Sequence, residues 1–226
     1  MSGSYEFSIE SAPDYSFLNV SIPAGQKLMV EKSAMASMDT NVMMKTKMKG
    51  GLGRLLTKES LFINEFTAEG GPGSISIAPG PSGDMAHFAV SESQAVLLTG
   101  SSYVASTPGV KLDTKFQGLV KGFFSGESLF LIRCSGAGDL WFNTFGGLFS
   151  VDVTDEYIVD TGHICAFTEG LDYEIGRIGG YKSLFFSGEG FICRFRGQGR
   201  VWIQTRNPLG LVHWADGYRV VQSSSD

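Results

Sequence analysis

The histidines are the side chains in this sequence best suited to hold a metal ion or to move protons. His87, His163 and His213 lie far apart, outside the HxH and HExxH spacings that bring two imidazoles onto one metal. A zinc or iron site would need long-range folding to assemble them, and we expect neutral imidazoles with local hydrogen bonds instead. The sequence also lacks a GxSxG nucleophile elbow, a GxGxxG loop and a P-loop. It predicts no catalytic residue, no metal site and no cofactor, so we do not expect an enzyme.

Two glutamates recur within a repeated phrase and could form a pair of carboxylates for acid–base chemistry. The phrase FFSGE occupies residues 123–127 and returns at 185–189, and it ends in Glu127 and Glu189. Ser-Gly between apolar runs is typical of a hairpin turn, because glycine adopts positive φ at little cost. A glutamate that returns with such a turn is better suited to accept hydrogen bonds from backbone N–H groups. We interpret the phrase as a repeated corner of the fold.

Charge and cysteine usage limit the partners and the compartment. The chain has a formal net charge of −5, and phosphate recognition depends on Lys and Arg, so nucleic acid is not an expected partner. Cys134, Cys165 and Cys193 are scattered and form no CxxC pair, which favours free buried thiols in a reducing compartment. The first residues have neither the basic nor the apolar segment of a signal peptide, and no apolar run approaches the ~20 residues that span a bilayer. A cytoplasmic location is predicted.

Glycine content and apolar periodicity indicate an all-β fold. The chain has 30 Gly but only 7 Pro, which predicts many tight turns between short strands. In residues 73–79 apolar and polar side chains alternate, so Ile75 and Ile77 are expected on one face of a strand and the serines on the other. Residues 35–49 are the one stretch whose Met, Lys and Ala would favour helix. We predict a strand and a loop there.

Internal repetition divides the chain into three similar units. Each copy of the phrase leads to a glycine-rich turn and then to a strand with a tryptophan, DLWFNT at 139–144 and RVWIQT at 200–205. A more divergent first copy has RLLTKESLFI at 54–63 and GGPGSISIA at 70–78 in the corresponding places. Such repetition suggests one supersecondary unit used three times about a pseudo-threefold axis.

Units too small to bury a core alone should pack together. We therefore expect a single compact domain over residues 1–226, with approximate repeats at 1–90, 91–153 and 154–226.

A basic segment rich in Met and Leu, residues 43–58, is the first candidate for a binding surface. It reads MMKTKMKGGLGRLLTK and contains no acidic residue. As a binding surface it would present adaptable apolar side chains and positive charge to an acidic partner or an anionic membrane. The alternative is an edge strand with solvated lysines that deter strand pairing while Met and Leu fill the core. The residues proposed for this surface are Met43, Met44, Lys45, Lys47, Lys49, Leu52, Arg54 and Lys58.

The aromatic doublets of the repeated phrase, Phe123-Phe124 and Phe185-Phe186, are the second candidate. Adjacent residues of a strand face opposite ways, so one ring of each doublet should be buried and the other partly exposed. An exposed, repeated ring could form an oligomer contact or a shallow membrane anchor. The alternative is that both rings are covered within the monomer.

Three motifs together resemble one protein family over nearly the whole chain. They are GGLGRLLTKESLFINEFTA at 50–68, VDTGHICAF at 159–167 and GEGFICRFRGQGRVWIQTRN at 188–207, and they are similar to the altered-inheritance-of-mitochondria protein twenty-four family. The resemblance implies a fold similar to the tryptophan RNA-binding attenuation protein: a double-stranded β-helix or β-sandwich body of three related units. It also implies no established activity among bacterial members, and a mitochondrial relative is associated with inner-membrane organisation. The family offers no catalytic residues to assign here.

The sequence predicts a non-catalytic scaffold or interaction protein that forms homo-oligomers and binds a protein partner or an anionic membrane surface. An alternative is a small-ligand-binding or enzymatic β-barrel with a polar interior pocket, which a core of Phe, Leu and Ile would exclude. RNA binding by analogy with the attenuation protein would rest on fold alone, and the acidic chain offers no basic ring for it. Metal catalysis of the cupin type would need an HxH motif with a following Glu, which the sequence lacks.

Overall fold

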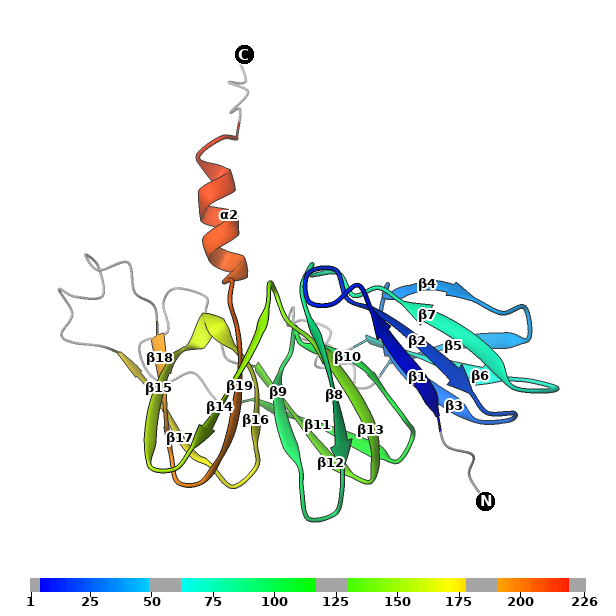
Figure 1. The fold of residues 1–226 in the computed structure, drawn as a ribbon, viewed down its shortest axis with the longest axis horizontal. Coiled ribbons are helices and arrows are strands. Elements are labelled where there is room, and N and C mark those ends of the chain that lie inside the picture. The colour runs from blue at the N-terminus through cyan, green and yellow to red at the C-terminus, as the bar shows by residue number, and fades with distance from the viewer. Residues whose placement is uncertain (1–4, 49–61, 117–129, 178–190, 220–226) are drawn as a thin grey trace.

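A computed structural model describes residues 5–48, 62–116, 130–177 and 191–219 of the chain. Within these ranges almost every element is a β-strand, and every pairing between the named strands is antiparallel (Figure 1). The all-β fold predicted from glycine content and apolar alternation is confirmed.

The N-terminal half of the chain supplies most of the first two sheets. The first sheet has the strand order β1 (Glu6–Glu10), β2 (Phe17–Ile22), β7 (Gly73–Ile77), β4 (Met35–Met38). The second sheet has the order β5 (Val42–Met48), β6 (Phe62–Ala68), β3 (Lys27–Glu31), β10 (Tyr103–Ser106), β13 (Gly138–Asn143), β8 (Met85–Val90).

The C-terminal half supplies most of the other two sheets. The third sheet has the order β11 (Val110–Phe116), β12 (Phe130–Gly136), β9 (Val96–Thr99), β16 (Ile164–Thr168), β19 (Gly199–Gln204), β14 (Leu148–Val153). The fourth has the order β15 (Glu156–Asp160), β18 (Phe191–Arg196), β17 (Asp172–Arg177). A 3-10 turn, η2 (Thr161–His163), precedes β16, and a helix, α2 (Pro208–Asp216), follows β19.

Strand order follows the same pattern in three consecutive groups of six strands, which we call the first unit (β2 to β7), the second unit (β8 to β13) and the third unit (β14 to β19). In each unit the first, sixth and third strands lie side by side, and so do the second, fifth and fourth strands. The second and third sheets each join strands of two neighbouring units. The units follow one another along the longest axis of the molecule, as Figure 1 shows.

The expected pseudo-threefold symmetry is not confirmed. Closure about such an axis would require the third unit to pair with the first, as each unit pairs with the next. Among the described strands, β4 and β15 both lie at the edges of their sheets instead. The unit limits also differ from the expected repeats: β8 pairs with β13 and β14 pairs with β19, so each begins a unit instead of ending one. Both the symmetry and the limits of the units depend on pairing between strands that are distant in sequence, which the sequence repeats do not specify.

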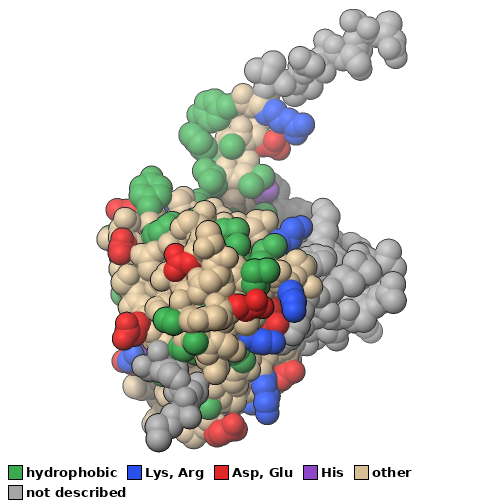
Figure 2. All heavy atoms as spheres, turned by 90° about the vertical axis from the view of Figure 1, so that its right-hand side faces the viewer, with side chains coloured by type: hydrophobic (Ala, Val, Ile, Leu, Met, Phe, Trp, Pro, Cys, Tyr) green, Lys and Arg blue, Asp and Glu red, His purple; other side chains and the backbone are tan. Residues whose placement is uncertain are grey.

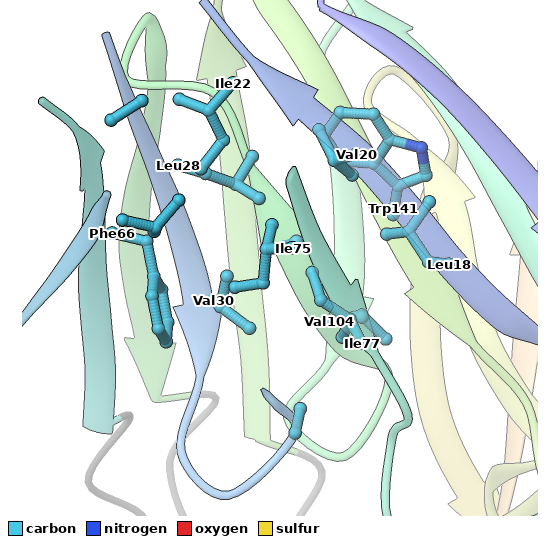
Figure 3. Close-up of a cluster of buried hydrophobic side chains, with 14 of the residues drawn as sticks. Leu18, Val20, Ile22, Leu28, Val30, Phe66, Ile75, Ile77, Val104 and Trp141 are labelled. Carbon is cyan, nitrogen blue, oxygen red and sulfur yellow. The ribbon is translucent and has the colours of Figure 1, made fainter. Parts of the chain in front are cut away.

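Three clusters of buried apolar side chains lie between consecutive sheets. The first cluster, between the first and second sheets, includes Leu18 and Val20 of β2 and Trp141 of β13 (Figure 3). The expected alternation in β7 is confirmed, because Ile75 and Ile77 are buried in this cluster. In β9 and β10 every residue is buried, since the shared sheets have a core on both faces.

The helical content differs from what the sequence led us to expect. Residues 35–49 contain two strands, β4 and β5, in agreement with the preference for strand over helix there. The helix lies instead at 208–216, which the sequence did not lead us to expect. Its start has recognisable signals: the Asn207 side chain accepts a hydrogen bond from the Leu209 N–H, and Pro208 occupies the first turn.

Candidate interaction surface

The histidines occupy three separate environments. His87 on β8 has its Nε2 atom 2.8 Å from Asp139 Oδ1, and its ring lies against Trp141. His163 in η2 has its Nδ1 atom 2.8 Å from the backbone oxygen of Gln204. His213 lies on the exposed helix α2. The fold therefore does not bring these three histidines together. Within the described ranges, no group of three or more His, Cys, Asp and Glu side chains could hold a metal ion.

The three cysteines are buried and free, as the sequence predicts. Burial raises the pKa of the thiols of Cys134, Cys165 and Cys193 to about 12. A nucleophilic cysteine needs an accessible thiolate, and these thiols are neither accessible nor easily ionised. They act as small apolar groups of the second and third core clusters.

Glu31, the last residue of β3, is partly buried, and this burial raises the pKa of its carboxyl from 4.5 to about 7. A carboxyl with a raised pKa binds its proton more tightly in the folded chain than in the unfolded chain. Stability therefore falls as the pH rises from about 4.5 through about 7, and the loss is complete above that window.

Replacing Glu31 by Gln should remove this penalty. We expect Glu31→Gln to increase the free energy of unfolding by about 1 to 2 kcal/mol at about pH 8, less than the whole shift would give because the carboxyl is partly exposed. At about pH 4 the carboxyl is protonated, and the variant should match the unaltered chain. Urea denaturation at the two pH values measures the difference. Glu92→Gln, at an exposed turn, is the control and should change stability little at either pH. A gain in stability for Glu31→Gln that is equal at the two pH values would contradict this role of Glu31.

The basic segment begins as the edge strand β5 of the second sheet. Met43 and Met44 are about half exposed and Lys45 is exposed, while Val42, the first residue of the strand, is buried in the first core cluster. The backbone of Lys47 lies opposite Ile63. The segment therefore starts as an edge strand, as the alternative interpretation expects, but its first two methionines remain available at the surface.

Methionines from two edge strands line one open side of the first core cluster. Met38 of β4 lies opposite Ile75 and Met44 of β5 lies opposite Phe66, and both partners belong to that cluster. Directly opposed residues of paired strands point to the same face of a sheet, so these methionines face the core from the two sheets that enclose it. Met35, also on β4, is exposed as well. The sequence did not lead us to expect Met35 and Met38, because only the pairing of β4 with β7 places them beside the core.

The other predicted surface residues lie outside the described ranges. They are Lys49, Leu52, Arg54, Lys58, Phe123, Phe124, Phe185 and Phe186.

Helix α2 presents apolar side chains to solvent. None of its residues is buried, and Figure 1 shows it projecting from the body of strands. Figure 2, which views the end formed by the first unit, shows hydrophobic side chains along this helix and at the surface of the body below it. The exposed apolar residues of the helix and the turn after it are Leu209, Leu211, Val212, Trp214 and Tyr218. In the described part of the chain, no helix is long and apolar enough to cross a membrane.

Comparisons with known proteins agree with this fold. The family model described as mitochondrial biogenesis AIM24 matches residues 7–206. An uncharacterized protein of Streptococcus pyogenes serotype M6 is 27% identical over 214 residues, which cover 89% of this chain and 86% of the relative. The crystal structure of a Streptococcus pyogenes protein superimposes with a TM-score of 0.81 at 24% identity, covering 95% of this chain and all of the other.

Proposed function

The chain belongs to the AIM24 family, and from that premise and its exposed apolar surfaces we propose that it is a non-catalytic scaffold that self-associates. The observation on which this rests is the distribution of side chains. Apolar residues are exposed on the edge strands β4, β5 and β15 and on α2, whereas the three core clusters are filled mainly by aliphatic and aromatic side chains. Exposed apolar groups concentrated at edges are typical of interaction surfaces.

The interior supports this proposal over a ligand-binding barrel. Among the described residues, the buried polar side chains are those of Ser, Thr, Asn and Gln together with Glu65, which forms an ion pair with Lys27, and no buried His or Arg accompanies them. The ion pairs formed by Glu156 with Arg194 and Arg196, and by Glu169 with Arg133, lie at the surface. A site for acid–base chemistry would need such groups to meet in a cavity shielded from water.

Light scattering coupled to size-exclusion chromatography tests self-association. We expect the unaltered full chain to show an average mass above that of one chain and to gain mass as its concentration rises. The mass of a single chain at every concentration would contradict the proposal.

A second candidate function is attachment to an anionic membrane surface, which the exposure of Met43, Met44 and Lys45 on β5 favours. Flotation with vesicles of phosphatidylserine and phosphatidylcholine should recover the chain, less so at high salt, because screening weakens attraction between surface charges. A variant with Met43→Ser, Met44→Ser and Lys45→Glu should lose most of this binding. Phe149→Ser on β14, another exposed apolar position, is the control. Flotation that the triple variant retains would contradict the membrane role.

A further inference from the structure

Two junctions inside the chain join neighbouring units, and both use the same pair of strand positions. The second strand of one unit pairs with the third strand of the next, as β3 with β10 and β9 with β16, both antiparallel. Met29 lies opposite Ser106 in the first junction, and Leu97 lies opposite Phe167 in the second. Neighbouring units are therefore joined by the same type of strand pairing at both junctions.

The same two positions are open at the two ends of the row. β15 is the second strand of the third unit, β4 is the third strand of the first unit, and both are edge strands among the described strands. The fourth strands, β5, β11 and β17, are edges in all three units, so their open edges belong to the unit itself. β4 and β15 differ from these fourth strands, because their counterparts β10, β16, β3 and β9 are paired on both sides, whereas β4 and β15 are paired on one side only.

The two open edges have few of the features that usually protect an edge strand. Exposed edge strands commonly contain charged side chains, Lys above all, or Pro, or are bent by a bulge. β4 reads MASM and has no charge, and neither strand contains Lys or Pro. β15 reads EYIVD, but its Glu156 is paired with Arg194 and Arg196 of the neighbouring β18, and its Asp160 accepts a hydrogen bond from the Gly162 N–H. The register of β4 against β7 does shift between Met35 and Ser37, but β10 and β16 have the same irregularity and are paired on their other side. The bulge is thus compatible with strand pairing at this edge.

Side-chain exposure separates the open positions from the paired ones. Equivalent positions in the three units are found from the residue that each one faces within its own unit. By this comparison Met38, opposite Ile75 of β7, is equivalent to Ser106 and Phe167. Ile158, opposite Arg194 of β18, is equivalent to Met29 and Leu97. Met38 is 40% exposed and Ile158 is 41% exposed. The corresponding residues in the internal junctions are Ser106 at 0%, Phe167 at 0%, Met29 at 8% and Leu97 at 4%.

We propose that copies of this chain associate head to tail by pairing β15 of one copy with β4 of the next, antiparallel and with Ile158 opposite Met38. The inference rests on the self-association proposed above and names its surface. In both internal junctions the second strand contributes a side chain to the core of the following unit, Met29 to the second cluster and Leu97 to the third. Ile158 would in the same way cover Met38 at the open side of the next copy's first cluster. Such a contact is heterologous and generates rings or open filaments.

The contact between copies should be weaker than the internal junctions. Trp141 and Trp202, on the sixth strands of the second and third units, both insert into the core of the preceding unit. The corresponding residue of the first unit is Ser76, whose hydroxyl donates a hydrogen bond to Asn19. Without that indole, pairing between copies loses much apolar burial, and we expect association that reverses on dilution.

Two single variants test the pairing by blocking one edge each. Met38→Lys blocks β4 and leaves β15 free, and Ile158→Lys blocks β15 and leaves β4 free, because an edge lysine keeps its charge solvated and resists pairing. Light scattering on either variant alone should give the mass of one chain. An equimolar mixture should give two-chain particles and nothing larger, since only one compatible pair of edges remains. Phe149→Lys, on the free edge strand β14, should assemble like the unaltered chain.

The other outcomes overturn the proposal in distinguishable ways. If the unaltered chain assembles and either single variant assembles equally, edge pairing is wrong while self-association stands. If the mixture remains single chains, the two edges are not complementary. If the unaltered chain is itself a single chain at every concentration, both proposals fail.

A cysteine pair tests the register and does not depend on the lysine variants. In the double variant Met38→Cys and Ile158→Cys, mild oxidation should link chains through disulfides in a ladder of covalent multimers, because directly opposed strand residues are close enough to bridge. The native cysteines are buried and should not take part. Ile158→Cys combined with Phe149→Cys should give no such ladder, and an equal ladder from this control would overturn the register.

Discussion

Trp141→Ala should lower the free energy of unfolding by about 3 to 5 kcal/mol, the largest loss we expect from a single side chain. The indole is fully buried in the first core cluster, and the exposed ring of Phe7 on β1 meets it edge to face with ring centroids 5.2 Å apart. Trp141 belongs to β13 of the second unit, yet it packs with Leu18 and Val20 of the first (Figure 3). Its removal therefore opens a cavity and also weakens the contact between two units.

Chemical denaturation followed by circular dichroism measures this loss. Trp214→Ala is the matched control, because Trp214 lies exposed on α2 and should cost little. Trp141→Phe should cost less than Trp141→Ala, since it keeps a ring in the cluster and removes an indole N–H without a hydrogen-bond partner among the described residues. Equal losses for Trp141→Ala and Trp214→Ala would show that the indole does not contribute to the junction.

Gly109→Ala should be among the most damaging of the small backbone substitutions, with a loss of more than about 3 kcal/mol or failure to fold. A methyl group at this position would lie 2.0 Å from the backbone oxygen of Ala137. The Gly109 oxygen also accepts a hydrogen bond from the Ala137 N–H, so the two turns are held in contact. No side-chain rotation can relieve a clash with the main chain, and the turn before β11 would have to move.

Gly71→Ala is the control for this prediction, because nothing lies within 4 Å of the position a methyl group would take there. It should leave stability unchanged or increase it by about 0.4 to 1 kcal/mol through the reduced freedom of the unfolded chain. Thermal unfolding of the two variants beside the unaltered chain measures the difference. A Gly109→Ala protein as stable as Gly71→Ala would mean that the close approach of the two turns does not constrain the fold.

Sequence alone predicted the features that depend on neighbouring residues. Alternation identifies β7, with Ile75 and Ile77 on its buried face, because successive side chains of a strand point to opposite sides. The same argument fails for β9 and β10, whose residues are all buried, since a sheet with a core on both faces needs no polar side. Helix α2 was missed although Asn207 and Pro208 mark its start, because its nine residues are fewer than the window over which a helical apolar period can be recognised.

The candidate surface was predicted only in part. The sequence singled out Met43, Met44 and Lys45 as a cluster of apolar and basic side chains, and the structure leaves them exposed on an edge strand. It did not indicate Met38 or Ile158. These residues look like ordinary strand positions until the sheet order shows that both lie at edges.

By itself, the sequence determined that this is an all-β chain of the AIM24 family with free, buried cysteines. Turn residues, period-two alternation and family motifs are local, so they can be read along the chain. Tertiary structure alone decided that each junction tryptophan enters the preceding unit's core and that, among the described strands, β4 and β15 are left at the two ends of the row of units. These features depend on hydrogen bonding and packing between strands far apart in sequence, and a repeated sequence shows that units are alike without fixing how one contacts the next.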